Sequence, residues 1–178
     1  RPEAKNAVNG PLADALNAAI EELDEDAGLT AGVITGAGGG FSSGMDLKWF
    51  ATKGPPAGLG KFLRTGAKKP LIAAIEGFAL AGGLEMALTC DLLVAADNVR
   101  FGIPEAKRGL FAAGGALMRL PRVIPHGVAM EMALTGDPIP AQRALELGLI
   151  ARVSAPGAAL DVALELATTI ALNAPLSV

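Results

Sequence analysis

The chain has 178 residues, of which 51% are hydrophobic, and this length and composition indicate a well-packed domain and exclude a largely disordered protein. The net charge is −3 and aromatic residues make up 4%, which disfavours nucleic-acid binding because such a surface needs clustered Lys and Arg beside aromatic side chains. No stretch of the sequence approaches the roughly 20 apolar residues of a membrane span.

Helix and strand patterns alternate along the first hundred residues. Residues 9–26 carry one apolar stripe and an early Pro11, which predicts a helix. A second helix is predicted over 82–90, and the Pro- and Gly-rich stretch 45–63 predicts a mobile loop with short helices. Short apolar runs predict strands, in a sheet covered on both faces, at 31–35, 70–76 and 91–97.

The second half of the chain is richer in helix. Its patterns predict helices over 114–120, 127–134, 140–148 and 155–173. One late strand is predicted over 149–153. Strand–helix alternation followed by a helix-rich end indicates the α/β class.

The single cysteine, Cys90, cannot form an internal disulfide and suits a reducing compartment, so we expect a cytoplasmic location. Its place between a helix and a strand pattern favours a small buried residue. The sequence starts at Arg1 rather than Met and stops directly after a helical pattern, so we expect both ends to be incomplete. A cleaved targeting peptide is compatible with this sequence.

A first glycine-rich loop, TGAGGGFSSGMD (35–46), fits neither common nucleotide motif. Counted from Gly36, the last glycine of a dinucleotide fingerprint falls on Phe41, and Gly44 is followed by Met-Asp where a P-loop needs Lys-Ser/Thr. What this loop can provide is a tight turn that exposes backbone N–H groups near Gly44 and Met45.

A second loop, ALAGGLE (79–85), opens a predicted helix. A helix start carries unpaired N–H groups and a partial positive charge, so it can bind an anion. Donors converging from both loops would form an oxyanion hole. Glu85 comes three residues after Gly82, about one helical turn along the same face, which places a carboxylate beside these donors.

Glu105 follows Pro104 in a turn and is a second candidate. Two carboxyl groups flanking one small space can move protons on and off carbon. Structural roles stay open on residue types alone. Glu85 can reach back to cap its helix, and Glu105 can be a first-turn acid that the helix dipole favours.

Taken together, the segments resemble the enoyl-CoA hydratase/isomerase (crotonase) superfamily. The resemblance implies a crotonase-like α/β superhelix of β-β-α turns, with a core region at 1–125 that holds a CoA-thioester site. It implies a mostly helical region at 126–178 for oligomerisation, in a homotrimer or a dimer of trimers. The matching segments are RPEAKNAVN, GAGGGFSSGMDLK, KPLIAAIEGFALAGGLEMALTCDLLVAAD, RFGIPEAKRGL and AMEMALTGDPIPAQRALELGLIARV.

The resemblance also assigns roles by position. It implies that the N–H groups of Met45 and Gly82 form the oxyanion hole, and that Glu85 and Glu105 are the two catalytic glutamates of a hydratase. Contacts to CoA are implied for Lys5, Ala7, Asp46, Leu47 and Lys48. CoA enters as part of an acyl-CoA substrate, so no separate cofactor and no metal are expected.

The implied reaction is syn addition of water to a trans-2-enoyl-CoA. One glutamate takes a proton from water and the other gives a proton to the α-carbon, and we expect Glu105 to be the acid. The sequence departs from the family at Ala81, where a glycine is common, and at FAAGGALMRLPR (111–122), a region that shapes the acyl pocket. Retention of both glutamates favours a hydratase.

Other activities stay open. An isomerase using one carboxylate, another crotonase-type acyl-CoA lyase or hydrolase, and a non-catalytic acyl-CoA-binding protein are the alternatives. A Ser-His-Asp hydrolase would have to use His126, the only histidine, and the AGGLE segment lacks a serine; we expect a loop or helix-start role for His126. Trp49 and Phe50 either line the acyl entrance or pack structurally.

Overall fold

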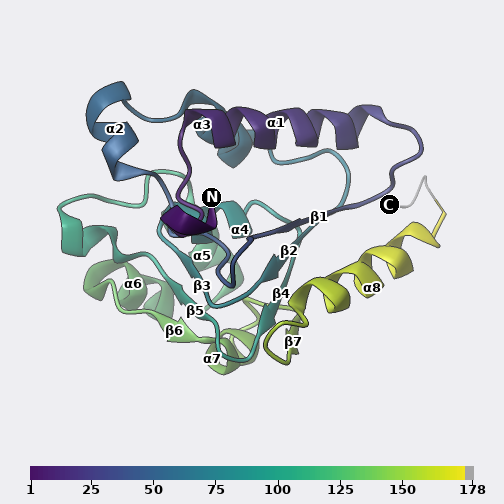
Figure 1. The fold of residues 1–178 in the computed structure, drawn as a ribbon. Helices are drawn as coiled ribbons and strands as arrows, with labels where there is room; N and C mark the ends of the chain where they lie inside the picture. The colour runs from purple at the N-terminus through teal and green to yellow at the C-terminus, as the bar shows by residue number, and fades with distance from the viewer. Residues whose placement is uncertain (175–178) are drawn as a thin grey trace.

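The computed structural model of the chain describes residues 1–174 (Figure 1). Within them, a four-stranded parallel sheet has the order β1-β2-β4-β7, and a three-stranded sheet has the order β3-β5-β6. The strands of the first sheet are β1 (Gly32–Thr35), β2 (Leu71–Ile75), β4 (Leu92–Ala96) and β7 (Arg152–Ser154). Those of the second are β3 (Phe78–Leu80), β5 (Arg100–Gly102) and β6 (Ile139–Pro140). The predicted α/β class is confirmed.

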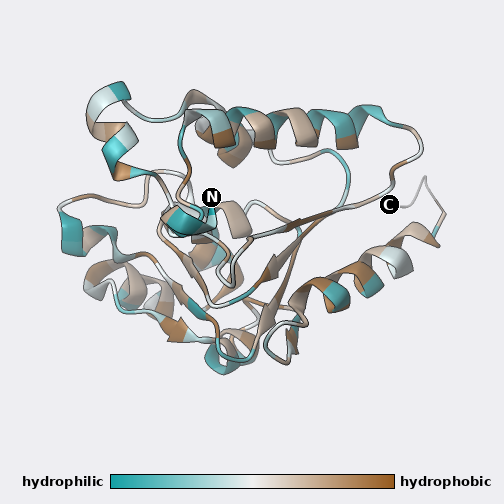
Figure 2. Cartoon of the chain, in the orientation of Figure 1, coloured by the Kyte–Doolittle hydropathy of each residue, from teal (hydrophilic) through white to brown (hydrophobic). Residues whose placement is uncertain are grey.

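The four-stranded sheet is buried on both faces, as its uninterrupted apolar runs predict. All five residues of β2 are buried, and because side chains alternate along a strand they enter two different cores. Leu71, Ala73 and Ile75 join the main core of the molecule. Ile72 and Ala74 face the other way, toward α8 (Ala159–Ala171). Figure 2 shows the apolar colouring of these strands against the more hydrophilic turns of α1.

Three helices of the first half lie on the side of the sheet opposite α8 (Figure 1). The first, α1 (Gly10–Glu25), begins where the Asn9 side chain accepts a hydrogen bond of 3.1 Å from the Leu12 N–H. The second, α2 (Leu47–Lys53), buries no side chain completely. The third, α3 (Ala57–Thr65), packs on α1 through buried Leu59, Phe62 and Leu63. The predicted short helices in 45–63 are therefore present.

The rest of the chain supplies short helices and connections. The predicted helix over 82–90 is α4 (Gly82–Ala87), which ends three residues earlier than expected. The helices predicted after residue 110 are also present, and the late strand lies at β7. These helices are α5 (Ala116–Val123), α6 (His126–Thr135), α7 (Ala141–Glu146) and α8. Within residues 1–174, no helix has both the length and the apolarity needed to cross a membrane.

The three-stranded sheet was not predicted. Its strands contain three, three and two residues, which is too short for a hydrophobic period to be recognised. Two 3₁₀ helices, η1 (Pro2–Ala4) and η2 (Pro104–Arg108), were not predicted as elements, although a first helical turn at Glu105 was left open and η2 is that turn. The second sheet matters for the site because β3 leads into α4 and β5 leads into η2, so it brings Glu85 and Glu105 to the same region.

Candidate active site

A cavity of about 690 Å³ opens between α3, the start of α4 and η2. Its walls are mostly apolar, and the ionisable side chains among its lining residues are Glu85, Glu105 and Arg108. The lining residues are Ser43, Met45, Leu47, Phe50, Pro55, Pro56, Leu59, Gly60, Leu63, Leu80, Ala81, Gly82, Glu85, Pro104, Glu105, Arg108, Leu110, Phe111, Ala113 and Gly114. A pocket of this size and character can enclose a small organic ligand.

The N–H group of Met45 points away from Val8, the residue with which Met45 forms an isolated β-bridge. Gly44 accepts a hydrogen bond of 2.8 Å from the Val8 N–H, and the Asp46 N–H donates one of 2.9 Å to Val8. Successive peptide groups of an extended segment point to opposite sides, so the Met45 N–H faces the other way. It has no hydrogen-bond acceptor among residues 1–174.

Gly82 is the first residue of α4, so its N–H has no partner within the helix. The two loops approach very closely here. A Cβ atom built on Gly82 would lie 3.4 Å from the Met45 nitrogen, and one on Gly44, whose φ is +94°, would lie 2.7 Å from the Gly82 nitrogen. Glycine at 44 therefore allows the contact that brings the two N–H groups together. Such a pair can act as donors to one oxygen atom.

Glu85 is 5% exposed and lies in α4, whose six residues are all buried. Its Oε1 accepts a hydrogen bond of 3.2 Å from the Ala116 N–H at the start of α5. Ala81, the N-cap residue of α4, makes no side-chain capping hydrogen bond. The Glu85 carboxylate does not take the capping role considered for it, because it accepts the long-range hydrogen bond from Ala116 instead. Burial raises the pKa of Glu85, while the N–H groups of Ala116 and its neighbours and the charge of Arg119 oppose that rise.

Glu105 lies in the first turn of η2, directly after Pro104. Its Oε2 is buried and has no hydrogen-bond partner among the described residues. Burial raises the pKa of Glu105 to about 7, and the negative charge of Glu85 adds to the rise. A carboxyl group with a pKa near 7 keeps its proton in part of the molecules at neutral pH and can donate it.

The residues expected to contact CoA lie around the Met45 turn. Leu47 lines the cavity, whereas Lys5, Ala7, Asp46 and Lys48 do not. The main-chain oxygen of Lys5 accepts a hydrogen bond of 3.0 Å from the Ser43 N–H, which places Lys5 beside the cavity wall. Ala7 is next to Val8, which bridges to Met45. Lys48 is exposed on α2.

The carboxylate of Asp46 has a structural role. Its Oδ1 caps α2 by accepting from the N–H groups of Lys48 and Trp49 at 3.0 and 3.1 Å. Its Oδ2 forms an ion pair of 2.9 Å with Arg1. These partners, the Trp49 N–H foremost, hold the pKa of Asp46 below its usual range. Asp46 thus fixes the turn that presents the Met45 N–H.

The other residues considered from the sequence lie as follows. Phe50 lines the cavity, and Trp49 packs against Gly10 instead, where a Cβ atom would meet its ring at 2.5 Å. His126 is exposed at the first position of α6, away from the cavity lining. Cys90 is buried, as expected. Within residues 1–174, no three His, Cys, Asp or Glu side chains group as metal ligands would.

Arg119, which holds the turn that packs on Glu85, was not identified from the sequence. Arg119 donates to the main-chain oxygens of Leu63 at 2.6 Å and Gly114 at 3.2 Å, so it ties α3 to the turn before α5. A Cβ atom on Gly114 would lie 2.4 Å from Glu85 Oε2, which shows how closely this turn packs on the carboxylate. The only signal in the sequence was the GG pair in FAAGGALMRLPR, and it did not reveal its partner.

Comparison with known proteins identifies the family. The enoyl-CoA hydratase/isomerase family matches residues 1–178. The chain belongs to this family. It is 43% identical to enoyl-CoA hydratase EchA19 of Mycobacterium tuberculosis, in a match that covers 100% of this chain and 71% of that protein. It is 40% identical to the (E)-benzylidenesuccinyl-CoA hydratase of Thauera aromatica, in a match that covers 100% of this chain and 73% of that protein.

A solved structure supports the same assignment. An enoyl-CoA hydratase from Mycobacterium tuberculosis H37Rv superimposes with a TM-score of 0.94 at 54% identity, covering 99% of this chain and 71% of that one. The resemblance to the enoyl-CoA hydratase/isomerase family and the crotonase-like fold predicted from it are confirmed. At the level of the family, the chain is an enoyl-CoA hydratase-type enzyme, a lyase that acts on acyl-CoA.

Proposed function

We propose that this chain adds water across the double bond of a trans-2-enoyl-CoA, with Glu85 and Glu105 as the proton-transfer pair. The observation that carries the proposal is that both carboxyl groups line one apolar cavity together with Met45 and Gly82, whose N–H groups have no acceptor among residues 1–174. A cavity that served only to bind an acyl chain would have no use for two such carboxyl groups, because burying them is costly.

The thioester carbonyl oxygen accepts hydrogen bonds from the N–H groups of Met45 and Gly82. As water attacks the β-carbon, negative charge moves onto this oxygen and an enolate forms. The two donors bind the enolate more tightly than the ground-state carbonyl, and this difference lowers the barrier. The positive end of α4, which begins at Gly82, adds to the effect.

The surroundings of the two glutamates support different roles. Burial raises the pKa of Glu85, but the Ala116 N–H that it accepts and the nearby charge of Arg119 oppose that rise by favouring its ionised form. It takes a proton from water as the oxygen bonds to the β-carbon. Glu105, with a pKa of about 7, is protonated in a large share of molecules at neutral pH and gives its proton to the α-carbon. Both side chains line the same cavity, which suits syn addition.

The CoA portion of the substrate extends past the Met45 turn in this proposal. Lys5 and Lys48 provide positive charge for its phosphates, and Ala7, Asp46 and Leu47 offer backbone groups along the route. CoA arrives as part of the substrate, so the reaction uses no separate cofactor. One curated relative is named for a particular acyl group, benzylidenesuccinyl, and the other only as an enoyl-CoA hydratase, so the proposal assigns no particular acyl group to this chain.

We further propose that the chain assembles as a homotrimer or a dimer of trimers. The support is an exposed apolar surface on α5, α6 and the segment before them, and a large patch of this kind marks an interaction site. Its exposed hydrophobic residues are Phe111, Leu117, Met118, Val123, Met130 and Leu134. Sedimentation equilibrium of the protein tests this, and a monomer at micromolar concentration would contradict it.

The hydration proposal is tested with a short trans-2-enoyl-CoA, whose loss of absorbance reports hydration. We expect Glu85→Gln and Glu105→Gln each to lower kcat by at least two orders of magnitude, since each removes one proton-transfer group. Both variants should still bind acyl-CoA. The control is Glu25→Gln, because Glu25 is exposed at the end of α1.

The same experiment separates the alternatives. Double-bond migration without hydration, lost in one glutamate variant only, would indicate an isomerase. Binding of acyl-CoA without turnover at any chain length would reject the hydratase proposal in favour of a non-catalytic protein.

A further inference from the structure

The main cavity contains one positive side chain that the proposed hydration does not use. Its ionisable lining residues are Glu85, Glu105 and Arg108. The two glutamates transfer protons, and the polar contacts of the thioester are made by backbone N–H groups. Ser43 is the one hydroxyl residue of the lining, and the remaining side chains are apolar. Arg108 is itself exposed, so it is a charged group where the otherwise apolar cavity lining meets solvent.

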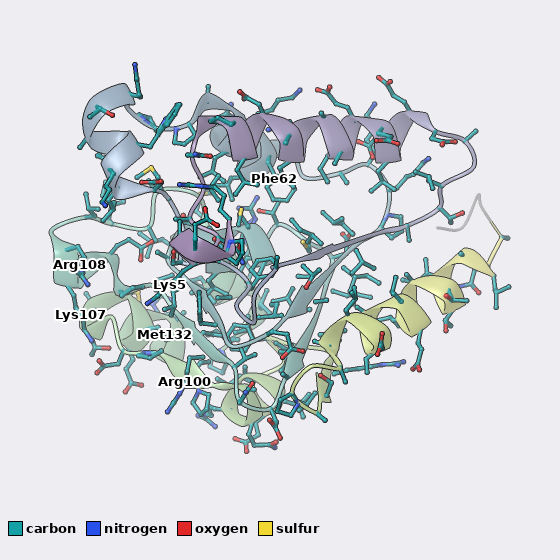
Figure 3. All side chains as sticks on the ribbon, in the orientation of Figure 1. Lys5, Phe62, Arg100, Lys107, Arg108 and Met132 are labelled. Carbon is teal, nitrogen blue, oxygen red and sulfur yellow. The ribbon has the colours of Figure 1, made fainter. Side chains whose placement is uncertain are left out.

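Arg108 has no acidic partner within residues 1–174. No ion pair joins it to Glu105, although both belong to η2. Its neighbour Lys107 behaves differently, because the Lys107 ammonium pairs with Asp137 at 2.5 Å and does not line the cavity. Figure 3 shows Lys107 and Arg108 side by side on η2. Of these two adjacent cations, Arg108 is therefore the one that can bind a ligand in the cavity.

The position of Arg108 relates it to the reacting atoms. Glu105 and Arg108 are three residues apart in a 3₁₀ helix, which has three residues per turn, so their side chains leave from the same side about 6 Å apart along the axis. An acyl chain whose α- and β-carbons lie at Glu105 and Glu85 can extend past Glu105 to Arg108. Leu110 and Phe111 continue the same wall.

A guanidinium group is a poor neighbour for a plain alkyl chain. The chain would displace water from the guanidinium and return no hydrogen bond, which costs free energy. A carboxylate on the acyl group would instead accept two parallel N–H bonds from the planar guanidinium. The other anions on the substrate are the phosphates of CoA, for which Lys5 and Lys48 lie near the Met45 turn. In Figure 3, Lys5 is set apart from Arg108.

We propose that Arg108 is a specificity-determining residue that binds a second carboxylate, carried on the acyl group, so that the enzyme prefers dicarboxylic enoyl-CoA substrates. This inference rests on the proposed function, since it assumes that the cavity holds the acyl group. It adds the chemical class of the substrate, which neither glutamate specifies.

The test uses ligands that cannot be hydrated. Binding of saturated dicarboxylic acyl-CoA thioesters of four, six and eight carbons is measured by calorimetry against the monocarboxylic thioesters of equal length. For one of these lengths, we expect the protein to bind the dicarboxylic member about tenfold more tightly. Arg108→Met should remove that preference while binding of the monocarboxylic thioester stays within about twofold. Lys107→Met, the matched control, should keep the preference.

Two results would overturn the inference. Equal affinity for both members at every length means that Arg108 does not select a carboxylate, and enoyl-CoA hydration can still hold. An equal loss of affinity for free CoA and for both thioesters in Arg108→Met means that the guanidinium binds a CoA phosphate instead. If no thioester binds at all, the proposed function fails first and this inference fails with it.

Discussion

The Oε1 atom of Glu85 accepts a hydrogen bond of 3.2 Å from the main-chain N–H of Ala116, the first residue of α5. This contact joins two segments that are 31 residues apart. It gives a buried carboxylate a donor that stabilises its ionised form. Arg119 holds the turn that carries this donor, so the ionisation state of Glu85 depends on residues outside the cavity lining.

Replacing Arg119 should change the pH dependence of hydration. Arg119→Met removes a positive charge that favours ionised Glu85, so the pKa of Glu85 should rise further. Because Glu85 must be ionised to take a proton, the acidic limb of the kcat/KM profile should move to higher pH. The other charged group facing Glu85 is Glu105, which is unchanged in this variant.

Two further variants make the Arg119 result specific. Arg119→Lys keeps the charge and should keep the acidic limb in place, whereas Arg122→Met on the same helix should have no effect on it. On the acidic limb, raising the pH should restore activity to Arg119→Met, until Glu105, whose pKa is about 7, loses the proton that it must donate. An equal loss at every pH, without a shift of the limb, would mean that Arg119 acts through folding alone.

Gly114 should tolerate no side chain. A Cβ atom there would lie 2.4 Å from Glu85 Oε2 and 2.6 Å from Leu63, so Gly114→Ala should displace the carboxylate. We expect kcat to fall at least tenfold, because a small displacement of a proton-transfer group has a large effect on rate. The control is Gly127→Ala, since a Cβ atom at Gly127 meets nothing within 4 Å. Unchanged kcat in Gly114→Ala would contradict the placement of Glu85.

Ala81→Gly should stabilise the protein. Ala81 has a φ of +51° and a ψ of −130°, a sparsely populated conformation that costs a residue with a Cβ about 1–3 kcal/mol. Glycine relieves this strain but adds freedom to the unfolded chain, at a cost of about 0.4–1 kcal/mol. The free energy of unfolding, measured with urea, should therefore rise by about 1–2 kcal/mol. Ala19→Gly on the exposed side of α1 should lower it by about 1 kcal/mol.

Glu105→Gln should stabilise the protein at high pH while it abolishes activity. Burial raises the pKa of Glu105 to about 7, above its value of 4.5 in an unfolded chain. The folded state therefore holds a proton that the unfolded state has lost, and stability falls as the pH rises from about 4.5 through 7. Glutamine does not ionise, so Tm at pH 8 should increase by about 2–4 °C.

Below pH 4 both states of the parent protein carry a protonated Glu105, so Glu105→Gln should leave Tm nearly unchanged there. Calorimetric scans at the two pH values check this, with Glu25→Gln as the exposed control. A stabilisation of equal size at both pH values would show that the buried charge is not its cause.

The elements of the first half could be predicted from local signals. Pro11 and one apolar stripe indicate α1, and the apolar runs at 70–76 and 91–97 give two adjacent strands of a covered sheet. The two glycine loops also pointed to the segments that carry Met45 and Gly82. These signals work within a few residues of sequence, because caps, turns and strand alternation are local geometry.

The tertiary structure alone decided how these segments combine. Gly44 approaches Gly82, and Ala116 contacts Glu85, across 31 or more positions of the chain. Arg119 also makes a long-range hydrogen bond, to Leu63, besides its local one to Gly114. The three-stranded sheet of very short strands, which places α4 and η2 together, has no periodic signal of its own. Burial and desolvation depend on the whole packed chain, so the raised pKa of Glu105 and the lack of an acidic partner for Arg108 within residues 1–174 appear only when the fold is complete.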